Sequence, residues 1–262
     1  MNMKLISVDF SADFGFLKKE DINEGIYLTY NCLHKPALLG ILGAIAGLGG
    51  LFQGYIDNKL PEYYEVLGHL KTGVRPIAKN GMHGKTIIKY NNSVGYANLD
   101  GGNLIVAEQT LIKPSFQVFI LVDLDVLIEK KLYSSLMNHE SYFIPYLGKN
   151  EFQLWWTNFQ DYDFKYLEDI SEAVRIDTLF IKKNNTSVQT PQSGFAGTLL
   201  NFDSPVSNDF FMFFEELPVG YDENLKNYRK EKFIYTNKKI APNNLPDNVY
   251  WLKNADSYVQ LI

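Results

Sequence analysis

An uncharged, glycine-spaced run from Ala37 to Phe52 constrains the fold of this chain more than any other segment. Leucine, isoleucine and alanine fill the positions between its glycines, which is the composition of a buried helix. A short apolar strand, Leu5–Phe10, and a polar turn with Lys18 and Lys19 come before it. The unpaired N–H groups at a helix start attract anions. The block therefore predicts a strand, a basic turn and a helix start that suits a phosphate backbone.

The composition is that of a globular protein. Hydrophobic residues make up 46% and charged residues 21% of the 262 residues, which argues against disorder. The formal net charge of −5 counts against a free-standing nucleic-acid binder, which is usually basic overall. A single cysteine, Cys32, excludes an internal disulfide and a multi-cysteine zinc site. A reducing, cytoplasmic compartment is therefore expected.

The candidate for a membrane span is the same uncharged run, Pro36–Phe52. A membrane helix needs about 20 apolar residues, whereas this run is shorter and holds five glycines. Gly43 and Gly47 have the spacing of paired membrane helices, but small residues equally let a helix lie close to a sheet. The start of the chain lacks the pattern of a secretory signal. We expect a buried helix without membrane contact, and membrane association through residues 36–52 is the minor alternative.

The order of elements in the first 150 residues predicts an α+β fold. The predicted strands are 3–10, 115–122, 142–147 and 152–156, and the predicted helices are 36–48 and 124–138. Apolar residues at helical spacing mark the second helix, with Asp123 as its N-cap. Gly148 is predicted to form the turn between the last two strands. The order is that of a ferredoxin-like (RRM-like) unit.

The character of the sequence changes after residue 150. An acidic stretch is followed by short apolar segments between polar loops, which predict strands. These predicted strands are 178–183, 210–214, 233–235, 249–251 and 258–262. The predicted organisation is a ferredoxin-like domain over residues 1–150 and a β-rich C-terminal region over residues 151–262, packed on it.

One window carries a clear charge signal. Residues 66–99 contain no Asp or Glu, although the chain has an excess of acid. The cations and histidines inside it are His69, Lys71, Arg75, Lys79, His83, Lys85 and Lys89. Because the window is also rich in turn-forming residues, it predicts an extended hairpin whose lysines follow phosphates and whose tyrosines, Tyr90 or Tyr96, stack on bases. A solvated loop whose lysines only aid solubility is the alternative.

Catalytic patterns are sparse. The glycines at 47–50 match neither the dinucleotide fingerprint nor the Walker pattern, so a packing or turn role is favoured. The histidines lack the spacing of metal ligands, and no cofactor is predicted. Cys32 and His34 are two residues apart, but a cysteine packed near a helix start is favoured over a catalytic dyad. A metal-independent RNA-cleaving group of Tyr30, His83 and Lys85 is the enzymatic alternative.

Several motifs resemble the Cas-five family of CRISPR Cascade subunits, in particular the type I-B branch within the RAMP superfamily. They are Asp13-Phe14-Gly15-Phe16-Leu17-Lys18-Lys19, Leu28-Thr29-Tyr30, the proline-started helix from Lys35 to Gly43, Thr110-Leu111-Ile112-Lys113-Pro114, and the segment from Phe143 to Phe152 with its Pro-Tyr-Leu-Gly-Lys core. The resemblance covers about residues 3–155. The chain differs from the family pattern at the helix start, where Lys35 takes the place of the usual basic residue. It also has no recognisable glycine-rich RAMP loop near the C-terminus.

The resemblance implies a non-catalytic subunit that caps the 5′ handle of the crRNA. It implies a ferredoxin-like domain with an inserted β-hairpin "thumb", which we place at about 66–103. The implied partners are the crRNA, the Cas-seven backbone subunit and the Cas-eight large subunit, and target DNA near the PAM end is a further one. The expected RNA-binding residues are Lys18, Lys19, Tyr30, Lys35, Arg75, Lys79, His83, Lys85, Lys89, Lys113, Tyr146 and Lys149. Another branch of the family cleaves precursor crRNA, so a metal-independent endoribonuclease is the alternative function.

Overall fold

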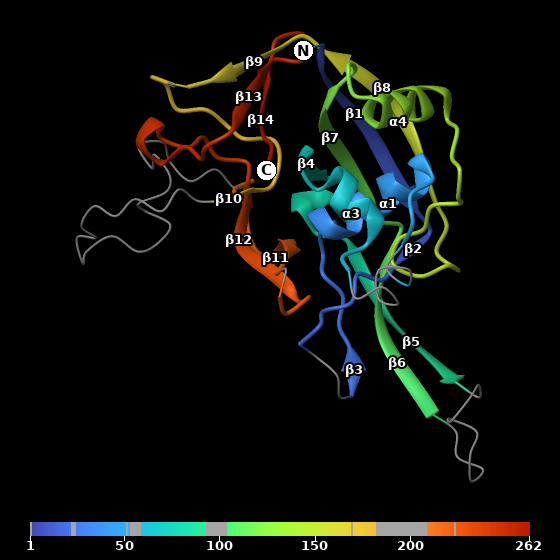
Figure 1. Cartoon of the computed structure of the whole chain (residues 1–262). Coiled ribbons are helices and arrows are strands. Elements are labelled where there is room, and N and C mark those ends of the chain that lie inside the picture. Colours follow the sequence, from blue (N-terminus) through green and yellow to red (C-terminus); the bar gives the residue numbers. More distant parts are fainter. Residues whose placement is uncertain are drawn as a thin grey trace.

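A four-stranded antiparallel sheet lies at the centre of the protein, as the computed structural model shows (Figure 1). The structure describes residues 2–21, 25–50, 52, 59–92, 104–168, 170–181, 209–222 and 224–262. The central strands are β1 (Met3–Ala12), β4 (Lys71–Pro76), β7 (Ser115–Asp123) and β8 (Leu154–Tyr162). Among the described residues, the α-helices are α1 (Lys35–Ala46), α3 (Glu62–Leu67) and α4 (Leu127–Asn138).

The strand order confirms the α+β, ferredoxin-like prediction. In space the strands follow β4-β7-β1-β8, with every neighbouring pair antiparallel. Along the chain the unit is β1-α1-β4-β7-α4-β8, so each half contributes a strand-helix-strand. This is the β-α-β-β-α-β arrangement that the sequence predicted.

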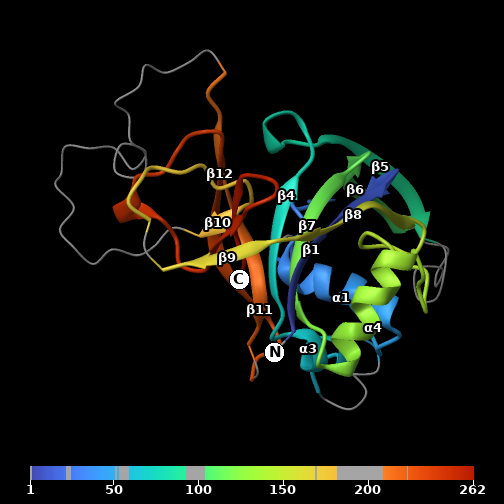
Figure 2. The ribbon, with the colours of Figure 1, turned by 90° about the horizontal axis from the view of Figure 1, so that it is seen from above.

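The two faces of the central sheet are covered by different parts of the chain (Figure 2). Alternation along β1 directs Ile6, Val8 and Phe10 into the core beneath the helices. Leu5 lies on the other face, where it packs with Tyr250 and other apolar residues of the C-terminal strands. The C-terminal region therefore covers one end of the sheet face opposite the helices.

Helix α1 confirms the prediction of a buried, uncharged helix. Pro36 stands in its first turn, and it ends at Gly47, whose φ of 85° is the left-handed conformation that glycine adopts most readily. A side chain at Gly43 would collide with Tyr63 of α3, which explains the glycine there. Among the described residues no helix is long and apolar enough to cross a membrane.

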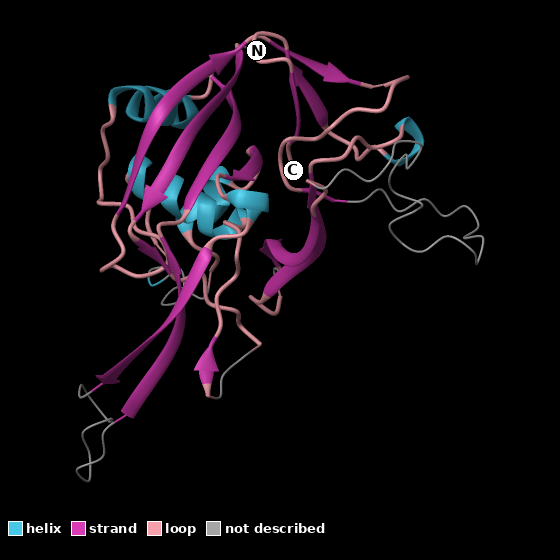
Figure 3. Ribbon diagram, turned by 180° about the vertical axis from the view of Figure 1, so that it is seen from behind, coloured by secondary structure: helices cyan, strands magenta, loops and turns pink. Residues whose placement is uncertain are grey.

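A long hairpin of β5 (Gly84–Asn92) and β6 (Leu104–Ile112) projects from the central unit (Figure 3). We call it the arm. Two short strands, β2 (Phe14–Gly15) and β3 (Ile26–Tyr27), pair with the other edge of β6. The arm corrects the predicted extent of the insertion, because residues 71–76 pair with β7 as β4 of the central sheet. Residues 93–103, also placed in the insertion, lie outside the described residues.

The C-terminal region contributes two further three-stranded sheets. They comprise β10 (Phe180–Ile181), β12 (Tyr228–Thr236) and β11 (Met212–Tyr221), and β14 (Ser257–Gln260), β13 (Val249–Leu252) and β9 (Phe164–Leu167). Two 3-10 turns, η1 (Lys79–Gly81) and η3 (Pro242–Asn244), complete the described elements. Leu179, Leu217 and Phe233 belong to the same hydrophobic core as α1 and β1, so the region is packed on the first 150 residues.

Two local predictions were wrong. Helix α4 begins at Leu127, and Asp123 is the last residue of β7, where its carboxylate accepts the N–H of Asp125. Residues 142–147 form no strand: the N–H groups of Tyr142 and Phe143 donate to the last carbonyls of α1. The segment thus provides hydrogen-bond donors for carbonyls at the end of α1, which have no partner within the helix. No local sequence pattern indicates this role.

Candidate nucleic-acid interface

The arm presents two chemically different faces. Residues paired directly across a hairpin share a face, and Lys85, Ile87 and Lys89 are paired with Leu111, Gln109 and Ala107. This acid-free face, which we call the arm face, comprises Lys85, Ile87, Lys89, Asn91, Ile105, Ala107, Gln109 and Leu111. Both lysines are exposed, and so are half of Ile87 and two thirds of Ile105. Cations interleaved with exposed apolar surface suit a phosphate backbone with its bases.

The opposite face of the arm is fastened to the central unit. Glu108, 6% exposed, accepts hydrogen bonds from Tyr90 and from Lys149, the latter at 2.7 Å. Burial lowers the pKa of Lys149, but its hydrogen bonds, above all to Glu108, raise it overall. Lys149, predicted as a phosphate partner, is therefore already paired and acts as a clamp at the base of the arm.

A polar cleft of about 290 Å³ continues from the arm face towards β11 and β12. Lys85 at the base of the arm lines it together with Lys19 and Lys230, and so do Glu215 and Asp21. We call it the basal cleft. Lys230 is paired with Glu20 and Asp21. Glu216 lines the cleft as well, so three lysines and three carboxylates face it. Lys19 and Lys85 are both on the predicted list.

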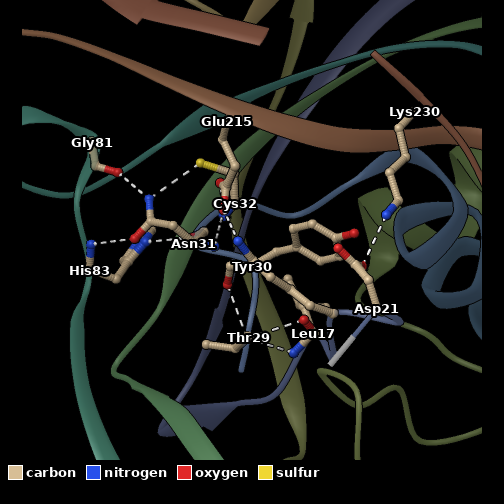
Figure 4. A network of polar contacts seen from close by, with 11 residues as sticks. Leu17, Asp21, Thr29, Tyr30, Asn31, Cys32, Gly81, His83, Glu215 and Lys230 are labelled. Carbon is tan, nitrogen blue, oxygen red and sulfur yellow. Dashed lines mark hydrogen bonds and ion pairs between the residues drawn. The ribbon is translucent and has the colours of Figure 1, made fainter. Parts of the chain in front are cut away.

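A hydrogen-bonded network holds the basal cleft in shape (Figure 4). Glu215 of β11 accepts the N–H groups of Asn31 and Cys32 at 2.8 and 3.2 Å. The Asn31 side chain donates to the carbonyl of Gly81 and accepts the N–H of His83. Burial raises the pKa of Glu215, opposed by these N–H groups and by Lys19 and Lys85. The network joins the turn before the arm to the C-terminal sheet.

His83 is a structural residue, which corrects its prediction as a thumb residue. It is 8% exposed, and its two ring nitrogens contact the carbonyls of Asn31 and Ser115 at 3.2 and 3.1 Å. Burial lowers its pKa. Tyr30, the second member of the suggested cleaving group, is 2% exposed, and burial raises its pKa to about 12. Tyr30, His83 and Lys85 therefore do not form an open acid–base group in this arrangement.

The burial of Tyr30 also corrects its prediction as a stacking residue. Its ring packs edge-on against His34, beneath Lys19 at 5.2 Å. Lys19 lies 4.0 Å from Glu215, and exposed Lys18 lies over the ring of Tyr27 at 4.2 Å. Tyr27, beside the arm on β3, is a half-buried ring that the sequence reading missed.

The start of α1 is closed, which corrects the prediction of an anion site there. His34 accepts the N–H of Ala37, and burial lowers the His34 pKa to about 3, so the cap is neutral. Lys35 donates to the main-chain oxygen of Ile262 at 2.9 Å, and burial, with Arg229 nearby, lowers its pKa to about 8. The C-terminal region thus occupies the place predicted for phosphate. Cys32 is fully buried beside this start, as the sequence favoured.

The remaining predicted residues are scattered. Lys79 is exposed in the turn η1, before the arm, and Lys113 is exposed at φ 45° after it. Arg75 lies on β4, not on the arm, and lines a separate cleft. Tyr146, 43% exposed, lies near α1. The structure therefore brings Lys19, Lys85 and Lys89 together along one surface and separates Arg75 and Tyr146 from it.

Tyr146 belongs to a large apolar groove of about 1340 Å³ beside α1. Its floor includes the small residues Ala37, Gly40 and Ala44, and one wall is the segment 142–146. Tyr142, Phe143 and Ile144 are exposed by 69%, 51% and 69%. We call this the aromatic groove. Exposed apolar surface on this scale marks an interaction site.

The sequence reading missed Glu215, Lys230 and Arg175. All three lie after residue 150, where neither a motif nor a charge window drew attention to them. In the described ranges no three His, Cys, Asp or Glu side chains lie close enough to hold a metal ion.

Comparison with known proteins found no matching family model and no matching curated protein. Solved structures do match. A chain of a CRISPR RNA-guided surveillance complex has 13% identity and a TM-score of 0.45, and the match covers 91% of each chain. A CRISPR protein from Archaeoglobus fulgidus has 14% identity and a TM-score of 0.44, over 98% of this chain and 97% of that one. A Cas protein has 12% identity and a TM-score of 0.38, over 93% and 98%.

Proposed function

We propose that this chain is a non-catalytic, RNA-binding subunit of a type I CRISPR Cascade complex, of the type I-B branch, that caps the 5′ handle of the crRNA. The observation that carries the proposal is the arm face, whose lysines lead into the basal cleft. The Cas-five-like motifs in the first 155 residues support the same function.

The RNA backbone would follow exposed Lys89 and Lys85 on the arm face to Lys19 in the basal cleft. Lys18 and Lys79 lie exposed beside this path and add phosphate contacts. Ile87 and Ile105 offer apolar surface to bases. Phosphate contacts give affinity that falls with salt, whereas contacts to the bases give preference for the handle.

The aromatic groove supports a role in assembly. An exposed aromatic wall beside a floor of small residues suits packing against another subunit, and the overall negative charge suits protein contacts away from the arm. We assign the groove to one of the two neighbouring subunits, the Cas-seven backbone subunit or the Cas-eight large subunit. Target DNA near the PAM end is a further partner of the assembled complex.

Co-purification of RNA tests the proposal. The tagged chain, expressed with its neighbouring subunits, should carry a small RNA with one fixed 5′ end. The double variant Lys85→Ala/Lys89→Ala should lose most of this RNA and bind the handle about tenfold more weakly, because two phosphate contacts are removed. The matched control is Lys130→Ala/Lys165→Ala, which removes two exposed lysines from α4 and β9. Equal RNA recovery in both double variants contradicts the assignment of the arm face.

Incubation with labelled precursor crRNA in EDTA tests the non-catalytic part of the proposal. Recovery of intact RNA is expected. Cleavage at one defined site, lost in a Lys85→Ala variant, would instead make the chain an endoribonuclease.

A further inference from the structure

A second cleft is lined by residues that directly precede the turn η1, whereas Met82, which follows the turn, lines the basal cleft. Arg75 on β4 and Arg175, in the loop before β10, both line this cleft, which has a volume of about 460 Å³. Tyr235 and Phe211 line it as well. We call it the arginine cleft. It brings together two of the three arginines of the chain, 100 residues apart in sequence.

The guanidinium group of Arg175 is fixed by Asp177 and still has N–H donors without a protein acceptor among the contacts given below. Its Nε and Nη2 atoms contact Oδ1 of Asp177 at 2.7 and 2.6 Å. The other oxygen of Asp177 accepts the hydroxyl of Ser257 at 2.6 Å. A guanidinium has five N–H donors, so Asp177 orients Arg175 and leaves donors for a further anion. The Arg175 side chain is 53% exposed.

Arg75 lacks such a partner. It is half-buried on β4 opposite Gln117, and none of the ion pairs among the described residues includes it. With Asp177 committed to Arg175, the described cleft lining keeps one uncompensated positive charge. A half-buried guanidinium without a counterion favours binding of an anion.

The aromatic wall indicates which kind of anion fits. Tyr235 is half-buried, and its ring lies 5.5 Å from that of Phe211. Tyr235 lines the same cleft as Arg75 and Arg175. Burial raises the pKa of Tyr235, Arg75 and Arg175 lower it, and Asp177 raises it. Guanidinium groups bind phosphate, and aromatic rings stack on bases. A nucleotide combines the two, and the cleft volume falls in the usual range for small-ligand sites.

The arginine cleft is also adjacent to the proposed RNA path. Phe213 lines the basal cleft and Tyr235 lines the arginine cleft, and their rings are 5.7 Å apart. The turn η1 lies directly against this wall, because a side chain at Gly81 would approach both rings within 2.6 Å. Lys79 is exposed in the same turn and lies in the sequence between Ala78, which lines the arginine cleft, and Met82, which lines the basal cleft. The two clefts thus adjoin at the wall formed by Phe213 and Tyr235, against which the turn η1 packs.

We propose that the arginine cleft binds one nucleotide of the strand held by the arm, with its phosphate on Arg75 and Arg175 and its base against Tyr235. This inference rests on the proposed RNA-binding function. It extends the RNA contact from the arm to the edge of the central sheet, and it gives Arg75 a role apart from the arm.

Equilibrium binding of the purified full chain to single-stranded handle RNA tests the inference, with fluorescence anisotropy at several salt concentrations. Arg75→Gln and Arg175→Gln should each weaken binding about fivefold to tenfold and reduce the slope of log affinity against log salt by about 0.7, the value for one phosphate on a single strand. Arg75→Lys should restore the slope. Arg229→Gln, which removes the third arginine, is the matched control, and thermal melting of each variant checks folding.

Photo-cross-linking gives a readout of position. RNA with single 4-thiouridine substitutions should cross-link at one position to the peptide that contains Tyr235, and Arg75→Gln should abolish that cross-link while those to the arm remain.

The outcomes separate the two proposals. If the wild-type chain binds RNA and Lys85→Ala/Lys89→Ala weakens it, but Arg75→Gln and Arg175→Gln leave affinity and slope unchanged, the inference is overturned and the proposed function stands. Loss of a protein subunit from the Arg75→Gln complex with unchanged RNA affinity also overturns it, in favour of a carboxylate from a protein partner. If the wild-type chain and its complex bind no RNA, both proposals fail.

Discussion

Three titratable side chains near the start of α1 serve the structure and are withdrawn from solvent. His34 caps the helix, His83 bridges two carbonyls, and Glu215 accepts two N–H groups. Histidine and glutamate side chains also occur on RNA-binding surfaces, which is why His83 was predicted to lie on the thumb. Burial and satisfied hydrogen bonds give these residues a different role.

The buried histidine cap predicts acid sensitivity. The pKa of His34 is about 3 in the folded protein and about 6.5 when unfolded. The unfolded chain therefore binds the extra proton, and the stability is complete above pH 6.5 and is lost as the pH falls towards 3. Between pH 7 and pH 5, His34 should cost about 2 kcal/mol of unfolding free energy. Urea unfolding at the two pH values measures it.

The control for this prediction is His34→Asn, which keeps a capping acceptor but does not titrate. Its stability should change about 2 kcal/mol less between pH 7 and pH 5 than that of the wild type. His83, whose pKa is also lowered, contributes a further loss of stability as the pH falls. Glu215, whose pKa is raised, contributes a gain of stability over the same range. Only the difference between wild type and His34→Asn therefore isolates His34. Equal pH dependence in both would contradict the prediction.

Glu215 is expected to matter for stability. Glu215→Ala leaves the N–H groups of Asn31 and Cys32 without their acceptor, at a cost of about 2 kcal/mol. Glu216→Ala, which removes an exposed carboxylate from the neighbouring position, should change stability by less than about 0.5 kcal/mol. Chemical denaturation compares them, and similar losses in both variants would show that the network contributes little.

At the scale of the element, both ends of α1 and the base of the arm depend on distant segments. The last carbonyls of α1 accept N–H groups from Tyr142 and Phe143 and the ammonium of Lys131. The arm is fastened through Glu108 to Lys149. Helix and hairpin were recognisable in the sequence by composition and turn residues, but the contacts that hold them in place were not, because the partners lie 41 to 99 residues away.

The clamp predicts how the arm opens. Lys149→Met leaves the buried Glu108 carboxylate without its counterion, which should cost about 3 kcal/mol. The loss should appear as faster amide hydrogen exchange in β5 and β6, with little change in the central sheet. The double variant Lys149→Met/Glu108→Gln should recover much of the protection, because the unpaired charge is gone. Equal exchange in wild type and single variant would rule out the clamp.

For the whole molecule, the two parts of the chain share one core. Leu179, Leu217 and Phe233 pack in the same cluster as the residues beneath α1, and β13 and β14 cover the other face of the central sheet. Because the two parts share this core, the unfolding of one part removes packing contacts from the other. It also places the C-terminal region over the helix start and leaves the arm and its adjoining clefts for ligands.

The shared core predicts a single unfolding transition. The three tryptophans report on different parts, because Trp155 and Trp156 lie on β8 and Trp251 lies on β13. Variants that keep only Trp251, or only the β8 pair, should unfold at the same denaturant concentration by fluorescence, after allowance for the stability change of each substitution. An earlier transition for Trp251 would mean that the C-terminal region unfolds by itself.

The sequence by itself determined the α+β class, the ferredoxin-like order of elements, the buried uncharged helix and a cationic hairpin, because periodicity, composition and charge are local properties of the chain. The tertiary structure decided which cations remain available. Long-range packing buries Tyr30 and His83, pairs Lys149 with Glu108, and places Lys35 under Ile262. It also places Arg75 on β4, in a cleft with Arg175, and not on the arm as predicted. The physical reason is that burial and pairing depend on residues far apart in the chain, which no local pattern encodes.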